Sequence, residues 1–274
     1  MSGADQLPLL AAAVFAAGLG AGVLAGLLGI GGGIVIVPAL YFVFGLLGVD
    51  DGIRMQMAVG TSLMSIVPTS IRSLTSHHKR GAVDRNILRR WALPLVLGVL
   101  AGTAAASAMP GTVLTAVFTV LILLMAAKLV FVPESWQLGR QMPGGWTERI
   151  YAALSGFFSA VMGIGGGIFG VSFMTLYGMP ILNAVATASG FGVVISLPGA
   201  LGFMAGGWGV DGRPPLSLGF VNLLSAALLL PATWLAVPFG VRLAHGIGRV
   251  MLERAFALFL LVTAVSMAAD LAAG

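Results

Sequence analysis

Hydrophobic residues run through this 274-residue chain in long stretches that short polar segments interrupt. Several stretches exceed the ~20 apolar residues that cross a bilayer as one helix. The pattern predicts an all-α polytopic membrane protein with ten apolar segments. In the first half the segments are expected at about 7–28, 34–48, 54–76, 88–107 and 112–132. In the second half they are expected at about 149–162, 168–178, 183–206, 216–240 and 248–270.

The two halves share the order of their segments and one pentapeptide. The sequence Gly-Ile-Gly-Gly-Gly occupies residues 29–33 and again residues 163–167. Glycine costs about 1 kcal/mol against alanine inside a helix, so each copy predicts a helix break. We therefore divide the chain into a first transmembrane repeat, 1–132, a connector, 133–147, and a second transmembrane repeat, 148–274.

The segments that follow the breaks are short. Segments 34–48 and 168–178 contain 15 and 11 residues. As helices they would rise roughly 16–22 Å, which is less than the ~30 Å hydrocarbon core. Re-entrant hairpins with the glycines near the middle of the membrane fit these lengths, and full spans are the alternative. Irregular backbone at that depth must be buried in protein or line a wet cavity.

Charged residues orient the two halves. Only 8% of the chain is charged, against about a quarter of a soluble domain. Eleven of the 14 lysines and arginines flank the third loop, the connector and the loop before the last segment, while Arg54 and Arg213 fall on the opposite side. The positive-inside rule makes the three basic regions cytoplasmic. Because each half has five segments, the halves are then inverted repeats, and both termini face away from the cytoplasm. The N-terminus lacks a basic n-region, which favours a first span over a cleaved signal peptide.

The doubled break is the predicted binding site. Glycines let the chain turn and leave N–H groups unpaired where the next helix starts, which makes an anion site without a fixed charge. Inverted symmetry brings such breaks together near the membrane midplane, with the anion between them. The predicted substrate-binding residues at the breaks are Gly31, Gly32, Gly33, Ile34, Gly165, Gly166, Gly167 and Ile168. Close helix packing is the alternative, and it is our interpretation for Gly18, Gly22 and Gly26.

Polar residues inside the spans complete the predicted site. Thr61 and Ser62 follow the first break, and Thr187 and Ser189 follow the second. Their hydroxyls could coordinate the oxygens of an anion, or they could bond their own helix backbone. Arg72 is a basic residue well within a predicted span, where ionisable groups are usually functional. It could attract the anion, or its side chain could reach the cytoplasmic surface.

The doubled pentapeptide, each copy followed by a short apolar segment and a stretch rich in alanine, threonine and serine, resembles the sulfite exporter TauE/SafE family. The resemblance covers about residues 10–270. It implies a carrier in the bacterial inner membrane for small sulfur-containing anions such as sulfite or sulfonates, usually an exporter. In that membrane the termini, which the charge pattern places away from the cytoplasm, would be periplasmic. The second half reads Ala186-Thr187-Ala188-Ser189 where the first reads Gly60-Thr61-Ser62, so the equivalence of these residues is approximate.

Several other functions find no support in the sequence. Gly165, Gly167 and Gly170 match G-x-G-x-x-G, but no βαβ pattern surrounds them, and the chain has no Walker A motif. The spans hold no acid, base or metal cluster, so we expect neither an enzyme nor a cofactor. The basic residues sit in short loops between spans, so we expect no nucleic acid as a partner. The apolar composition and the helix breaks indicate the lipid bilayer and a small anionic substrate as partners. An importer, a membrane scaffold that carries no substrate, and a homodimeric assembly stay open as alternatives.

Overall fold

The computed structural model describes residues 3–28, 32–131, 138–139, 141–246 and 249–273, which form ten helices and two short strands. The helices of the first half are α1 (Gly3–Leu28), α2 (Gly33–Leu46), α3 (Asp51–Lys79), α4 (Arg85–Ala108) and α5 (Gly111–Phe131). Those of the second half are α6 (Trp146–Met162), α7 (Gly167–Leu176), α8 (Ile181–Gly206), α9 (Leu223–Gly246) and α10 (Arg249–Ala273). Strands β1 (Ser217–Leu218) and β2 (Val221–Asn222) pair antiparallel just before α9.

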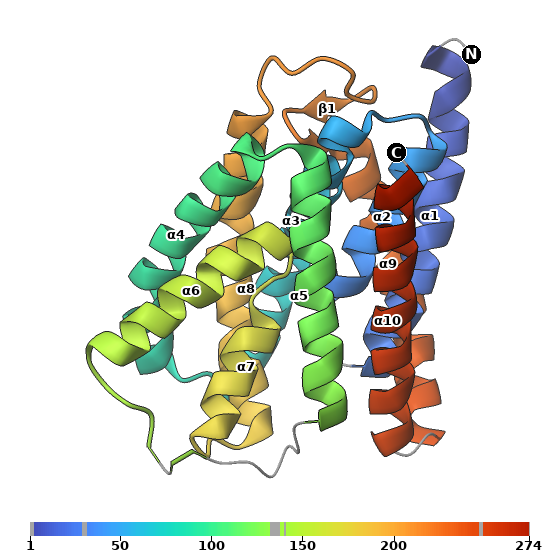
Figure 1. The fold of residues 1–274 in the computed structure, drawn as a ribbon. Coiled ribbons are helices and arrows are strands. Elements are labelled where there is room, and N and C mark those ends of the chain that lie inside the picture. Colours follow the sequence, from blue (N-terminus) through green and yellow to red (C-terminus); the bar gives the residue numbers. More distant parts are fainter. Residues whose placement is uncertain (1–2, 29–31, 132–137, 140, 247–248, 274) are drawn as a thin grey trace.

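The helices form one bundle in which α3 and α8 pack against each other. Figure 1 shows α4 and α6 on one side of the bundle and α1, α9 and α10 on the other. The start of α1 and the end of α10 lie at the same end, together with the starts of α3 and α5; we call this end the terminus face. The opposite end holds residues 80–84 and the start of α8, and we call it the connector face.

Of the helix pairs that join the halves of the chain, α1 with α9 and α6 with α4 make the most extensive contacts. A Cβ atom built on Gly18 or Gly22 would lie 2.8 Å from the Cβ of Ala232 or Ala236, respectively. Such a distance is shorter than a carbon–carbon contact, so both positions require glycine for the close approach of α1 and α9. The predicted packing role of these two glycines is confirmed, and the surroundings of Gly26 lie outside the described residues.

Five helices within the described residues are long and apolar enough to cross a membrane: α4, α5, α8, α9 and α10. Large apolar side chains on their outer faces, such as Leu93, Leu124 and Leu201, are exposed in the isolated chain and suit contact with lipid. The predicted all-α polytopic fold is therefore confirmed. Helices α2 and α7 contain only 14 and 10 residues, too few to cross the hydrocarbon core, which favours the hairpin alternative.

The boundary of one segment was predicted wrongly. A span was expected from about residue 216, but α9 begins at Leu223. The preceding residues form the β1–β2 pair, which turns at Gly219 with a φ of 55°. Asn222 then caps α9, because its Oδ1 accepts the N–H of Ser225 at 2.8 Å. Residues 216–222 include Leu216, Leu218, Phe220 and Val221 among their polar residues, so the hydropathy pattern did not separate this segment from the helix.

Candidate functional site

The second glycine run ends α6 and starts α7 through two left-handed residues. Gly163 has a φ of 65°, and the next N–H, that of Ile164, donates to the carbonyl of Ser159 at 2.9 Å and closes the end of α6. Gly166 has a φ of 72°, and α7 begins at the following residue. Glycine adopts positive φ without the steric cost that other residues incur, so these two positions determine the break.

The first glycine run reaches its helix differently. Gly31 lies outside the described residues. Gly32 has a φ of −48°, in the right-handed region, and its carbonyl accepts the N–H groups of Val35 and Ile36 at 3.1 and 2.9 Å. Helix α2 therefore starts at Gly33 directly from a right-handed residue, although the two pentapeptides are identical.

The two breaks touch each other in the interior of the bundle. A Cβ atom on Gly33 would lie 2.8 Å from the carbonyl oxygen of Gly163 and 3.1 Å from the Cα of Ile164. Ile34, the next residue of α2, is buried. The structure thus brings the start of α2 against the end of α6. The contact runs through the first two residues of the second pentapeptide, whereas the sequence had pointed to Gly165–Gly167.

The room around the two helix starts differs. Gly33 is closed off by the second break, whereas a Cβ atom on Gly167 would meet no atom of the described residues within 4 Å. Ile168, the next residue of α7, is half-buried. First-turn N–H groups have no partner within their own helix, so the start of α7 offers donors and the positive end of the helix dipole. Of the two predicted anion-binding ends, the start of α7 has more space.

Ser62 connects α3 to the second break. Its Oγ donates to the carbonyl oxygen of Gly163 at 2.9 Å, and its side chain is completely buried. The side chain of Ile66, one turn further along α3, lies against Gly165, since a Cβ atom there would come within 2.8 Å of Ile66 Cγ2. One face of α3 therefore supports the break with a hydroxyl and an apolar side chain.

The hydroxyls of Thr61 and Thr187 accept hydrogen bonds from residues that cap other helices. The Oγ1 of Thr187 accepts the N–H of Asp84 at 3.0 Å, and Asp84 is the N-cap of α4. The Oγ1 of Thr61 accepts the N–H of Asn222 at 2.9 Å, and Asn222 caps α9. Each threonine therefore fixes the start of a helix from the other half of the chain. The two contacts are equivalent: the third helix of each half bonds the cap of the fourth helix of the other half.

The two remaining predicted site residues contact neither break among the interactions of the described residues. The Oγ of Ser189 donates to the carbonyl of Ala186 in its own helix at 2.6 Å. Arg72 is exposed, and its guanidinium carbon lies 4.0 Å from the ring centroid of Trp234 on α9. The backbone bond of Ser189 and the aromatic contact of Arg72 are both common in structural roles.

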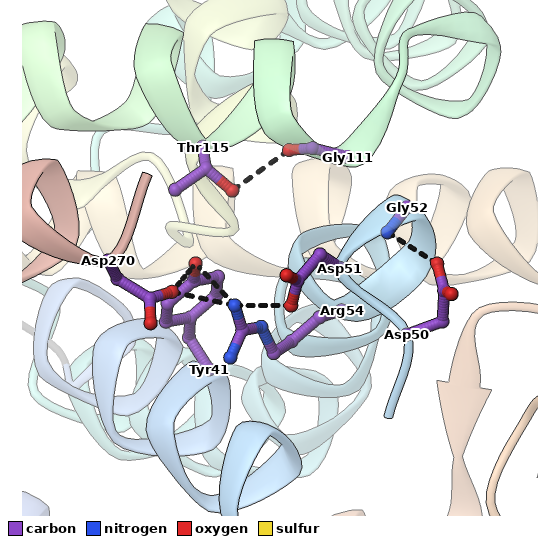
Figure 2. Close-up of polar contacts among 8 residues, drawn as sticks. All are labelled: Tyr41, Asp50, Asp51, Gly52, Arg54, Gly111, Thr115 and Asp270. Carbon is purple, nitrogen blue, oxygen red and sulfur yellow. Dashed lines mark hydrogen bonds and ion pairs between the residues drawn. The ribbon is translucent and has the colours of Figure 1, made fainter. Parts of the chain in front are cut away.

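A buried arginine near the terminus face, Arg54, was not among the functional residues predicted from the sequence. Arg54, which the charge pattern had assigned to the outer side, is only 8% exposed. Figure 2 shows its guanidinium between side chains of three helices. Its Nη2 lies 2.6 Å from Asp270 Oδ2, 3.0 Å from the Tyr41 hydroxyl and 2.5 Å from Asp51 Oδ1. The available signal was Asp50, a strong N-cap residue that places Arg54 within the first turns of a helix.

The connector face contains a buried charge of the opposite sign. Glu148, at the start of α6, is 3% exposed and accepts the indole N–H of Trp91 at 2.7 Å. Arg90 Nη2 lies 3.4 Å from the same carboxylate oxygen. Among the contacts of the described residues, neither this cluster nor that of Arg54 reaches the breaks. The described residues of the breaks therefore contact backbone groups, apolar side chains and the Ser62 hydroxyl.

An all-α bundle of membrane-length helices, with two glycine-broken hairpins that meet inside it, has the architecture of a multi-pass membrane transporter. The chain belongs to the sulfite exporter TauE/SafE family, whose model matches residues 14–267.

Curated relatives have names of the same kind. A probable membrane transporter protein of Haemophilus influenzae is 32% identical over 90% of this chain and 94% of its own length. The probable membrane transporter protein YunE of Bacillus subtilis is 25% identical over 93% of this chain and 94% of its own length. No solved structure showed significant similarity to the chain. The family and the relatives thus indicate a membrane transporter.

Proposed function

We propose that this transporter moves a small sulfur-containing anion, such as sulfite or an organic sulfonate, across the bacterial inner membrane, with export as its direction. The observation that carries the proposal is the contact between Gly33 and the second glycine break. It brings the start of α2 against the turn that ends α6, four residues before α7 begins. The first-turn N–H groups of α2 and α7 have no partner within their own helix, and both helix starts carry a positive dipole end. The family description supports the choice of a sulfur oxyanion and of export.

The proposed site lies at the start of α7, beside the contact between the breaks. Gly166, Gly167 and Ile168 would present backbone N–H groups, and Ser62 would hold the turn at Gly163 that shapes the site. Fixed charges are absent from the described contacts of the breaks, which suits a weakly hydrated monoanion. Burying a charge without a counter-charge is costly, and the cost rises steeply for a dianion such as sulfate.

We further propose that residues 1–132 and 148–274 are inverted repeats joined by the connector at 133–147. Two sets of contacts support this division. The pairs α1–α9 and α6–α4 exchange with each other when the halves are swapped, and so do the caps held by Thr61 and Thr187. The connector face, which carries Lys79 and Arg80, would be cytoplasmic, and both termini would be periplasmic.

Cysteine labelling tests this orientation cleanly, because the chain contains no native cysteine. A single cysteine at Ala82, in the loop between α3 and α4, should resist an impermeant maleimide in intact cells and react after the cells are opened. A cysteine at Asp211, in the exposed loop before β1, serves as the matched control and should react in intact cells. Labelling of Ala82→Cys in intact cells would overturn the proposed orientation.

The proposed substrate is tested with purified protein in liposomes. Thermal unfolding in the presence of hydrogensulfite, isethionate, sulfoacetate, taurine and sulfate should show stabilisation by a monoanion, because a ligand stabilises the state that binds it. Flux of the stabilising anion then separates a transporter from a scaffold, and flux into right-side-out or inverted cell membrane vesicles separates import from export. If no sulfur oxyanion stabilises the protein or moves across the membrane, the proposal is wrong.

A further inference from the structure

The Arg54 cluster joins three helices near the terminus face. Arg54 projects from α3, Tyr41 from α2 and Asp270 from the last turn of α10, and Asp51 adds a second carboxylate (Figure 2). The Tyr41 hydroxyl donates to Asp270 Oδ2 at 2.5 Å, the same oxygen that lies 2.6 Å from the guanidinium. A single carboxylate oxygen thus connects α2, α3 and α10.

One face of helix α2 contacts the guanidinium of Arg54. Arg54 lies over the Tyr41 ring, with 4.3 Å between the guanidinium carbon and the ring centroid. One turn further along α2, a Cβ atom on Gly45 would overlap Arg54 Nη1. Residues four apart lie on the same face of a helix, so Tyr41 and Gly45 form a cradle for the arginine. The far end of α2 cannot leave α3 without breaking these contacts.

The same helix begins at the first glycine break, so the cluster acts on an element of the proposed site. Gly33 at one end of α2 touches Gly163, and Tyr41, two turns away, is tied to Arg54. Helix α7 is held differently. Its side-chain contacts include the bond from Lys128 Nζ to Ser172 Oγ at 2.6 Å, which is exposed, and no ion pair involves α7 among the described residues.

The two carboxylates of the cluster are more exposed to solvent than the guanidinium. The side chain of Asp270 is 35% exposed and that of Asp51 is 57% exposed, whereas that of Arg54 is 10% exposed. Water can therefore replace the arginine at Asp270 when α10 separates from α3, whereas Asp51, on α3 itself, stays beside Arg54. The guanidinium loses Tyr41 and Asp270 in that step and turns toward solvent beside Asp51, because a buried charge that loses its partners is strongly unfavourable. Such a contact has two discrete states, joined and separated.

We infer that Arg54, Tyr41 and Asp270 form a lock that keeps the passage from the glycine breaks to the terminus face closed, and that its release opens that side of the transporter. The inference rests on the proposed transport function. Arg54 is a positioning residue in this scheme: it acts on the anion site through α2 and does not touch the anion. The structure then represents the conformation that is closed toward the terminus face.

Site-directed labelling tests the lock directly. The reporter is a single cysteine at Ser62, which lies against the second break and is completely buried. An impermeant maleimide applied from the terminus face should label it slowly in the otherwise unchanged chain. Arg54→Gln and Asp270→Asn should each raise the labelling rate by about fivefold or more, the lower end of the usual range for coupling between sites. Arg254→Gln, an exposed position on α10, is the matched control and should leave the rate unchanged.

A second reporter separates opening from misfolding. Ala126, on α5, is 1% exposed, and a cysteine there should stay unlabelled in every variant that is folded. Labelling of both reporters, or an unchanged rate at Ser62→Cys in the two lock variants, would overturn the lock. Flux is measured separately on the unmodified chain. If the lock variants are labelled faster but the unmodified chain moves no anion, the transport function is rejected and the lock is retained. If the chain moves the anion but the labelling rate is unchanged, the lock is rejected and the transport function is retained.

Discussion

Helices α2 and α7 start from identical pentapeptides and are packed very differently. Ten of the 14 residues of α2 are buried, against three of the ten residues of α7. The start of α2 is closed by the second break, while the start of α7 has free space beside Gly167. The far end of α2 is also tied to a buried arginine. Sequence identity therefore specifies the two breaks, but tertiary contacts decide how accessible each one is.

This difference has a natural explanation in a transporter built from inverted repeats. When two halves have the same design and opposite orientation, one conformation must treat them unequally for the site to open to one side at a time. A packed α2 near the terminus face and a looser α7 near the connector face would be one such conformation. Exchange of the two environments would then be the transport step.

The largest expected effect comes from filling the second break. Gly166→Val should abolish transport and lower the unfolding temperature, because left-handed backbone costs a residue other than glycine about 1–2 kcal/mol, and the new Cβ would overlap Ile195 Cδ1. Gly32→Val should also abolish transport but destabilise less, since its φ of −48° suits any residue. Flux and thermal unfolding in liposomes measure both.

The control for these two variants is Gly144→Val. Gly144 is exposed in the connector, and a Cβ atom there would meet nothing within 4 Å. It should transport and unfold like the unmodified chain. Full transport by both break variants would remove the breaks from the mechanism.

The comparison is sharpest at the equivalent glycines that begin the two helices. Gly33→Ala should destabilise the protein by about 1–3 kcal/mol, the usual cost of overpacking, because its Cβ would lie 2.8 Å from the Gly163 carbonyl oxygen. Gly167→Ala should leave stability unchanged, since its Cβ enters free space, but should weaken binding of the stabilising anion several-fold. Equal unfolding temperatures for the two variants would show that the helix starts are packed alike.

A smaller effect is expected from the hydroxyl that supports the second break. Ser62→Ala removes the bond to the Gly163 carbonyl and should cost about 1–3 kcal/mol, because the carbonyl then stays buried without that partner. Ser189→Ala is the matched variant and should cost almost nothing, since Ser189 bonds only a carbonyl of its own helix. Thermal unfolding measures both variants. A similar loss in the two would mean that Ser62 has no special role at the break.

Sequence reasoning succeeded where the determinants are local. Ten apolar segments and two helix breaks follow from hydropathy and from glycine's conformational freedom, and the structure contains both. The contact between the breaks was expected from the repeat, but its detail was not. Which glycine of each run makes the contact depends on the backbone angles within the runs, and the equivalent residues Gly32 and Gly166 have φ angles of −48° and 72° despite identical sequences.

The Arg54 cluster was missed for a different reason. Asp270 is 216 residues away from Arg54 in sequence, and no local sequence pattern predicts the contact between them. Thr61 and Thr187 were likewise matched to the site by their spacing from the breaks, whereas their hydroxyls hold cap residues 161 and 103 residues away. Partners of buried polar groups depend on how helices pack, and that information is spread over the whole chain.

The smallest expected effect concerns Arg72, the basic residue that the sequence offered as an attractor for the anion. Its side chain is exposed and rests on Trp234, a contact worth about 0.5–1 kcal/mol at an exposed site. Arg72→Gln should therefore change anion affinity by no more than about twofold, because water and salt screen an exposed charge. Arg89→Gln, on the exposed face of α4, is the matched control. The affinity of both variants for the stabilising anion, measured at low and high salt, tests this expectation. A large loss that is specific to Arg72→Gln and disappears at high salt would mean that Arg72 draws the anion toward the open start of α7.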